Sequence, residues 1–221
     1  MVDKEAAASG YGMTAPGLLF EHATQRGDAV ALRYKAYGLW QDVSFNEYAK
    51  SVRTVGCGFL ALGVAEGDSI AVIGENRCEW LYTDLATQAI GAVTVGIYTT
   101  NAAAECAYVL GHSESVVFIV ENEEQLDKAL EIRAELPKLR WIVVMDMEGL
   151  HDYSDPMVLS WAELLERGRA LEGARAEFSR RLAALDPLAT AILIYTSGTH
   201  RLFYPSDAPD DLTRDAPCRP R

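Results

Sequence analysis

Four short apolar runs, separated by segments with helical periodicity, dominate the middle of the chain. The runs predict strands over residues 69–74, 93–97, 116–120 and 141–145. Helices are expected between them, over residues 76–90, 102–110 and 123–136. Strands that are apolar along their whole length need cover on both faces, unlike strands that alternate apolar and polar residues. The pattern therefore predicts an α/β fold, a layered and mainly parallel sheet flanked by helices.

A hairpin and a long helix are expected before this region. Residues 29–34 alternate apolar and polar side chains, and residues 39–43 repeat the pattern after a short turn. Ser44 and Glu47 form a capping-box pattern, followed by apolar residues at intervals of three and four up to Gly63. Residues 56–61 spell a dinucleotide-binding fingerprint, but it lies inside this helix instead of after a strand, so a Rossmann site is not predicted.

Further helices are expected after the predicted sheet. Ser160 and Glu163 repeat the capping-box pattern, and helical spacing continues to about residue 171 and again over residues 176–185. In the helix over residues 76–90, Trp80, Leu81 and Leu85 are predicted to face inward. Core positions are predicted for the tryptophans in preference to the lining of a tunnel, although a core and a tunnel wall look alike in sequence; these residues are Trp40, Trp80, Trp141 and Trp161.

One more apolar run, over residues 192–195, ends in small polar residues. Thr196, Ser197 and Thr199 supply hydroxyl groups, and Gly198 lacks a Cβ, so backbone N–H groups there can approach an anion closely. These four residues are the candidate phosphate-binding residues. On composition alone, an ordinary turn is the commoner explanation of such a stretch. No lysine follows Gly198 directly, which argues against a P-loop phosphatase or NTPase.

Longer stretches of sequence resemble a known family. Residues 195–199, Tyr-Thr-Ser-Gly-Thr, resemble the start of the phosphate loop of AMP-forming adenylating enzymes, Tyr-Thr-Ser-Gly-Thr-Thr-Gly-x-Pro-Lys-Gly. Upstream stretches are similar in order and spacing to the N-terminal part of long-chain acyl-CoA synthetases; they lie at residues 74–81, 89–93, 97–100 and 107–114. The resemblance covers about residues 16–199 and implies an incomplete N-terminal domain of the adenylate-forming fold.

The resemblance implies a ligase that adenylates a fatty acid with Mg-ATP and passes the acyl group to coenzyme A. Its substrates would be a fatty acid, ATP and coenzyme A, with Mg²⁺ as cofactor. Thr196, Ser197, Gly198 and Thr199 would contact the β- and γ-phosphates of ATP. The strand at 192–195 would belong to a neighbouring sheet. The family's metal-binding glutamate, adenine and ribose sites and catalytic lysine have no counterpart here, so no catalytic or metal-ligating residue is assigned.

The similarity stops after Thr199. Residues 200–221 contain four prolines, four arginines and four aspartates and show no hydrophobic period, which predicts an irregular tail. A frameshift inside the phosphate loop is the leading hypothesis, because the Arg-rich composition suits an out-of-frame stretch of a GC-rich gene; a natural short paralogue is the alternative. We expect a flexible leader over residues 1–15, a partial AMP-binding domain over 16–199 and a non-family tail over 200–221.

Such a fragment is expected to be inactive and to bind ATP, Mg²⁺ and coenzyme A weakly. The alternatives are a non-catalytic acyl-binding or regulatory module, or another adenylate-forming ligase of the same superfamily. The net charge of −12 argues against nucleic acid or an anionic membrane surface as the main partner. The polar, acidic N-terminus is unlike a signal peptide and no apolar run is long enough for a transmembrane segment, so a cytoplasmic protein is expected, with peripheral membrane contact left open for the full-length enzyme.

The remaining polar residues give weaker signals. The cysteines are far apart and lack the spacing of a zinc site or a disulfide framework; they are Cys57, Cys78, Cys106 and Cys218. The isolated histidines at 22, 112 and 151 are expected at the surface or in helix caps instead of acting as bases. The acidic run over residues 121–124 is expected to be a solvated helix start.

Overall fold

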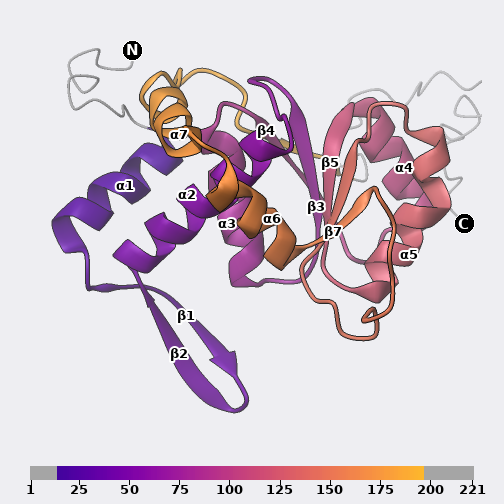
Figure 1. The fold of residues 1–221 in the computed structure, drawn as a ribbon, viewed down its shortest axis with the longest axis horizontal. Coiled ribbons are helices and arrows are strands. Elements are labelled where there is room, and N and C mark those ends of the chain that lie inside the picture. The colour runs from indigo at the N-terminus through magenta and orange to yellow at the C-terminus, as the bar shows by residue number, and fades with distance from the viewer. Residues whose placement is uncertain (1–13, 197–221) are drawn as a thin grey trace, which may run out of the picture.

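The computed structural model describes residues 14–196. A parallel sheet of six strands lies between two layers of helices (Figure 1), in the order β7-β6-β5-β3-β4-β8. Its strands are β3 Ser69–Ile73, β4 Val93–Ile97, β5 Ser115–Val120, β6 Trp141–Val144, β7 Val158–Ser160 and β8 Ile192–Ile194. This architecture confirms the predicted α/β fold class, with the four predicted central strands in one parallel sheet.

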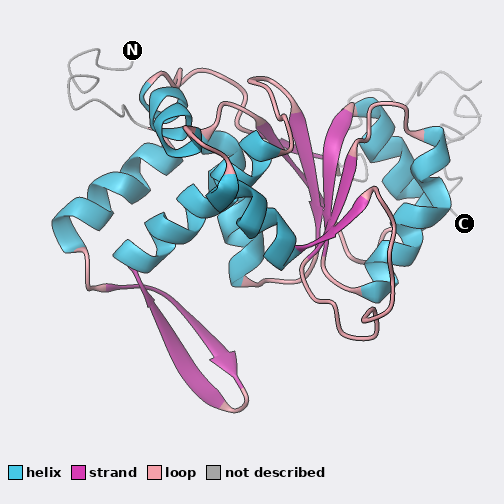
Figure 2. Cartoon of the chain, viewed as in Figure 1, coloured by secondary structure: helices cyan, strands magenta, loops and turns pink. Residues whose placement is uncertain are grey.

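The helices cover the two faces of the sheet unequally (Figure 2). One layer consists of α1 Ala15–Arg26, α2 Phe45–Ala61, α3 Cys78–Ala89, α6 Trp161–Ala170 and α7 Ala174–Ala183. The other consists of α4 Ala103–His112 and α5 Glu123–Ile132, extended by a 3-10 turn at Arg133–Glu135. Along β3, Ile70 and Val72 pack toward the first layer while Ala71 and Ile73 pack toward the second. Both faces of the strand are buried, which explains its continuous apolar sequence.

The predicted hairpin is confirmed, but it projects from the body of the molecule (Figure 1). Its strands, β1 Val30–Ala36 and β2 Leu39–Ser44, pair antiparallel around a two-residue turn at Tyr37 and Gly38. Both turn residues have positive φ, 50° and 82°, as the tight hairpin turns that match strand twist require. The core position predicted for Trp40 is wrong, because its side of the hairpin has no covering layer within residues 14–196 and the residue is 67% exposed.

The helix that contains the dinucleotide-like fingerprint is confirmed as α2, and its glycines serve helix packing. A Cβ on Gly58 would lie 2.8 Å from the backbone oxygen of Leu164 in α6, and one on Gly56 would lie 2.4 Å from the ring of Phe178 in α7. Gly168 of α6 is equally tight, since a Cβ there would lie 2.4 Å from the backbone nitrogen of Gly58. The missing side chains allow α2 and α6 to cross at close range.

Both predicted capping boxes are confirmed, whereas one residue predicted to face inward does not. Ser44 and Ser160 each accept a hydrogen bond from the backbone N–H three residues later, which confirms both capping boxes. Leu81 was expected to face inward with Trp80 and Leu85, but it is exposed on the outer side of α3. Trp80 and Leu85 pack against the core, as predicted.

The last strand differs from the expectation. The strand predicted over 192–195 was assigned to a neighbouring sheet, but β8 pairs in parallel with β4 in the central sheet, from Thr94↔Ile192 to Gly96↔Ile194. It forms the end of the sheet, and its outer edge has no strand partner among the described residues. Ile194 is 65% exposed there. No helix within residues 14–196 has the length and apolar character needed to cross a bilayer.

Candidate functional site

The candidate site lies at the carboxyl edge of the parallel sheet. Because β3, β4, β5 and β8 run in the same direction, the segments that follow them meet at this edge. Here β3 continues into residues 74–77, β4 into residues 98–101 and β8 into Tyr195 and Thr196. In open α/β sheets, ligands bind at this edge. The topology therefore brings the start of the predicted phosphate loop to a position that suits a binding site.

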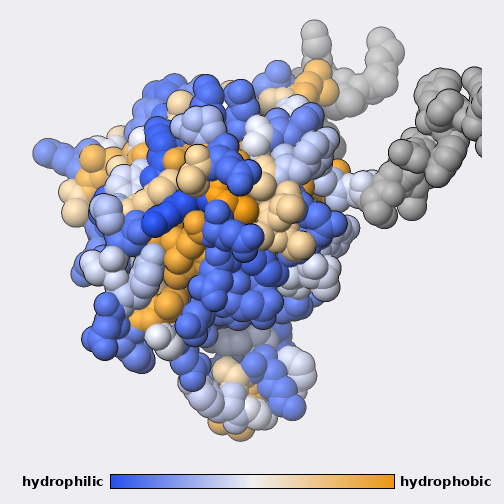
Figure 3. Space-filling model, turned by 90° about the vertical axis from the view of Figure 1, so that its right-hand side faces the viewer, coloured by the Kyte–Doolittle hydropathy of each residue, from blue (hydrophilic) through white to orange (hydrophobic). Residues whose placement is uncertain are grey.

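A groove of about 750 Å³ opens beside the end of β8. It lies between that strand end, the loop after β4 and α4, and its lining includes Tyr98, Asn101, Glu105, Tyr108 and Thr196. Thr196 is exposed, so its hydroxyl is available to a ligand. The outer face of the layer that contains α4 shows apolar residues gathered in an oblique band between hydrophilic ones (Figure 3). The groove volume lies within the range of small-molecule sites.

An aromatic cluster fixes the residue before Thr196. The hydroxyl of Tyr195 lies 2.7 Å from Nδ1 of His112 at the end of α4. The ring of Tyr108 stacks on His112, with centroids 5.7 Å apart, and meets the ring of Tyr195 edge-on. Burial raises the pKa of Tyr195, so its phenol remains protonated at neutral pH. The cluster therefore ties the end of β8 to α4.

His112 was expected to be an isolated surface or cap residue. It does occupy the last turn of α4, but it also contacts Tyr195, 83 positions further along the chain. The residues next to His112 in the sequence do not indicate this contact. Only the pairing of β8 with β4 places the two side chains together.

A charged network closes the sheet edge between β3 and β5. Glu121, the residue after β5, accepts a hydrogen bond from the backbone N–H of Glu75 at 2.7 Å and from Arg77 at 3.3 Å. Glu75 in turn accepts from the hydroxyl of Thr99 at 2.9 Å, which joins the ends of β3 and β4. Burial alone would lower the pKa of Arg77, but the carboxylates of Glu79 and Glu121 raise it, so the guanidinium remains charged.

The expectation of a solvated acidic run over residues 121–124 is wrong for its first member. The Glu121 side chain is only 15% exposed, because it packs over Gly74. A Cβ on Gly74 would lie 3.2 Å from the Cβ of Glu121, so the glycine makes room for this carboxylate. A helix does start here, as predicted, and Asn122 caps it by accepting a hydrogen bond from the N–H of Gln125.

The structure places only one of the predicted phosphate-binding residues. Thr196 lies at the groove, whereas Ser197, Gly198 and Thr199 lie outside the described residues. Within residues 14–196, no group of three or more histidine, cysteine or acidic side chains is arranged to hold a metal ion. The described part of the site thus supplies a hydroxyl, an aromatic wall and the carboxylate of Glu105.

Solved structures of adenylate-forming ligases share this arrangement of layers and strands, which gives the fold class. Among solved structures, the fold is similar to that of the anthranilate CoA ligase AuaEII in complex with anthranoyl-AMP. The TM-score is 0.60 and the identity 25%, over 69% of this chain and 27% of the ligase chain.

The chain itself belongs to the AMP-binding enzyme family, whose model matches residues 19–200. It is 32% identical over 182 residues to the long-chain-fatty-acid–CoA ligase ACSBG2 of Xenopus laevis, covering 82% of this chain and 24% of that protein. It is 37% identical over 182 residues to the long-chain-fatty-acid–CoA ligase FadD15 of Mycobacterium bovis, covering 82% of this chain and 29% of that protein. The matched part of the chain therefore spans less than a third of the length of these relatives, 24% and 29%.

Proposed function

We propose that this chain is the N-terminal portion of an AMP-forming long-chain acyl-CoA ligase. The observation that carries the proposal is the end of β8, where Tyr195 and Thr196 emerge beside a groove at the carboxyl edge of a parallel sheet. The relatives named above are long-chain-fatty-acid–CoA ligases, which supports a fatty acid as the carboxylate substrate.

The chemistry assigns a role to the hydroxyl-rich loop. A fatty acid carboxylate attacks the α-phosphate of ATP, and pyrophosphate leaves with its negative charge. Hydroxyls and backbone N–H groups aimed at the β- and γ-phosphates stabilise that charge as it develops, together with a lysine and Mg²⁺ in a complete site. In our proposal Thr196, Ser197, Gly198 and Thr199 supply this contact. Tyr195, held by His112, fixes where the loop begins.

We further propose that residues 1–221 alone are inactive. Three charge-assisted hydrogen bonds from the loop would contribute roughly 5–9 kcal/mol, at about 1.5–3 kcal/mol each. The loss of translational and rotational freedom when ATP binds costs roughly 4–15 kcal/mol. The two contributions cancel approximately, and the chain lacks the lysine that the family places after the second glycine, where residues 200–204 read His-Arg-Leu-Phe-Tyr. Tight ATP binding is therefore not expected.

Two versions of the protein test the proposal. The first is the 221-residue chain, and the second is a chain in which family-type sequence follows Thr199, taken from another reading frame of the same gene if that frame encodes Thr-Gly-x-Pro-Lys-Gly. We expect fatty-acid-dependent pyrophosphate release and acyl-CoA formation from the second version only. Thr196→Ala should weaken both reactions in that version, whereas Thr24→Ala, an exposed change on α1, should not.

Two results would contradict the proposal. Pyrophosphate release by the 221-residue chain that is lost on Thr196→Ala would show that the chain is active without family sequence after Thr199. A restored chain that releases no pyrophosphate with any fatty acid, while it does so with another carboxylic acid, would retain the family and refute the long-chain substrate.

A further inference from the structure

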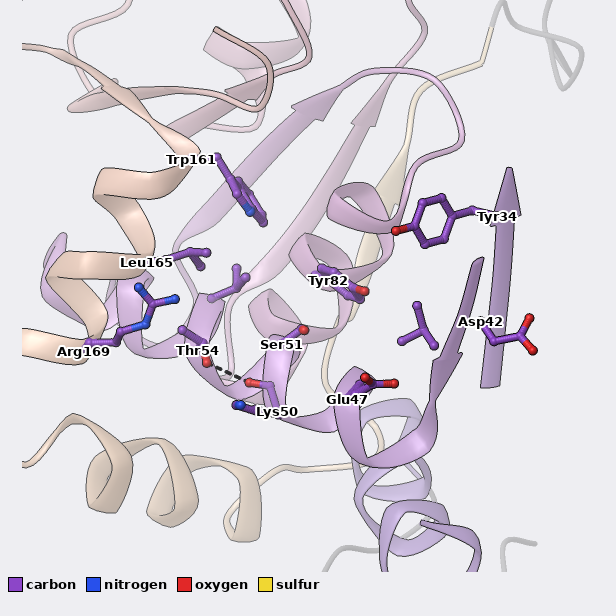
Figure 4. Close-up of a pocket in the computed structure, with 12 residues that line it drawn as sticks. Tyr34, Asp42, Glu47, Lys50, Ser51, Thr54, Tyr82, Trp161, Leu165 and Arg169 are labelled. Carbon is purple, nitrogen blue, oxygen red and sulfur yellow. Dashed lines mark hydrogen bonds between the residues drawn. The ribbon is translucent and has the colours of Figure 1, made fainter. Parts of the chain in front are cut away.

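A second groove lies in the helical layer that contains α2, α3 and α6, whereas the groove beside Tyr195 adjoins α4 of the other layer. It encloses about 400 Å³ between the β1–β2 hairpin, α2, α3 and α6 (Figure 4). Aromatic rings from three elements line it: Tyr34 from β1, Tyr82 from α3 and Trp161 from α6. Its floor includes Val55, which is 1% exposed. This volume is enough for a small organic ligand.

The acidic side chains of the groove already have hydrogen-bond donors. Asp42 accepts a hydrogen bond from Nη2 of Arg33 at 2.9 Å, and this pairing holds the pKa of the aspartate below its usual value. Glu47 accepts hydrogen bonds from the backbone N–H and the hydroxyl of Ser44, both at 2.8 Å, and these bonds lower its pKa. Both carboxylates are therefore committed to partners at the groove's rim.

The charged groups of the basic side chains are not bonded in this way. Neither Lys50 of α2 nor Arg169 of α6 forms a hydrogen bond or ion pair through its charged group within residues 14–196, although Lys50 is near enough to Glu47 to help lower the pKa of that carboxyl. With Asp42 paired to Arg33, the two basic side chains outweigh the one remaining carboxylate, Glu47, so the groove carries a net positive charge in a chain whose net charge is −12. Such a local reversal of sign attracts an anion.

The arrangement of the side chains suggests how a ligand would lie. Figure 4 shows Lys50 and Arg169 on neighbouring helices at one end of the groove, with Leu165 and the ring of Trp161 extending away from Arg169 along α6. Tyr82 faces the same space from α3. A charged head and a flat apolar body would therefore find separate partners.

We propose that this groove binds a small organic anion, with its acidic group between Lys50 and Arg169 and its flat apolar body against Trp161 and Tyr82. Arginine and lysine recognise carboxylate, sulfonate and phosphate groups through charge-assisted hydrogen bonds. The indole and phenol rings supply the apolar contact area. The site is separate from the groove beside Tyr195 and does not rest on the proposed ligase activity.

Equilibrium dialysis of the 221-residue chain against naphthalene-2-sulfonate tests the proposal. Saturable binding of one molecule per chain is expected. Lys50→Gln and Arg169→Gln should each weaken it by roughly two- to fivefold, the range for exposed ion pairs, and the double variant should weaken it further. Lys138→Gln is the matched control, since Lys138 is exposed and lies outside the groove. All these positions are exposed, so unchanged thermal unfolding is expected for each variant.

Two further probes separate charge from ring. 2-Naphthylmethylammonium has the same ring with the opposite charge and should bind more weakly than the sulfonate, whereas methanesulfonate has the charge without the ring and should compete poorly. Binding of the sulfonate should weaken as salt is raised, because the charges are exposed. Equal binding of both naphthalene probes, wild-type affinity in the double variant, or no saturable binding of the sulfonate would overturn the proposal.

Discussion

Gly168→Ala is expected to force α2 and α6 apart. The added Cβ would lie 2.4 Å from the nitrogen and 2.9 Å from the Cα of Gly58, and 2.8 Å from the carbonyl carbon of Cys57. All three atoms belong to the backbone, so no side-chain rotation can relieve the contact. The helices must separate along their crossing, which loosens the packing of Leu164 and Phe59, both fully buried.

Two opposing effects set the change in the free energy of unfolding. Overpacking of this kind costs typically about 1–3 kcal/mol, and rigid backbone neighbours favour the upper end. Alanine in place of glycine inside a helix returns about 1 kcal/mol. The net loss is therefore about 2 kcal/mol, which for a domain of this size lowers the midpoint of thermal unfolding by about 4–8 °C.

Gly111→Ala provides the matched control. Gly111 lies near the end of α4 as Gly168 lies near the end of α6, but its Cβ would meet only a side-chain carbon of Leu136, at an ordinary 3.7 Å. The same substitution should therefore leave stability unchanged or raise it by up to about 1 kcal/mol. Thermal and urea unfolding of both variants measure the difference. A Gly168→Ala protein as stable as the Gly111→Ala protein would refute the close helix crossing.

Three more predictions concern polar contacts. Glu121→Ala should lower the free energy of unfolding by about 1–3 kcal/mol, because it leaves a backbone N–H and a guanidinium without their acceptor, whereas Glu131→Ala, at an exposed position of α5, should change it by less than about 0.5 kcal/mol. His112→Ala and Tyr195→Phe should each cost about 0.5–1.5 kcal/mol, and the double variant should cost no more than the larger single effect if the two side chains bond to each other. Hydrogen bonds from two arginines lower the pKa of Glu177 to about 2, so its contribution to stability is present above the ordinary glutamate pKa and is lost as the pH falls toward 2. Unfolding of Glu177→Gln followed from pH 6 to pH 2 should show a weaker decline than the wild type; an identical decline would contradict the shift.

Local sequence patterns were sufficient for the central strands, the hairpin and the fold class, whereas α1 and β7 were not predicted. Continuous apolar runs identified the buried parallel strands, and the patterns at Ser44 and Ser160 located two helix starts correctly, because both signals act over a few residues. The glycines at 56 and 58 also carried a signal that was not used. Two residues without side chains inside a good helix indicate a close approach by another element, which α6 and α7 provide.

Pairings over long distances were not readable in the same way. The partner of β8 depends on how the whole sheet is ordered, so the assignment of this strand to another sheet failed even though its apolar character was recognised. The core position predicted for Trp40 was wrong for a related reason. Alternation of apolar and polar residues shows that a strand has two different faces, but not whether either face is covered. For Glu121, the acidic run gave the helix start correctly but could not reveal the partner at Arg77, 44 residues earlier.

The place of β8 at the end of the sheet has a consequence for the order in which the protein is made. Thr94 of β4 pairs with Ile192, which lies 98 positions further along the chain. At the ribosome's rate of about 5–20 residues per second, β4 waits roughly 5–20 s for its neighbour, far longer than helices and local turns take to form. The strands from β3 to β7 can assemble during that interval, with one side of β4 open to any other chain in reach. Synthesis speed between residues 97 and 192 therefore sets how long this side of β4 stays without its partner.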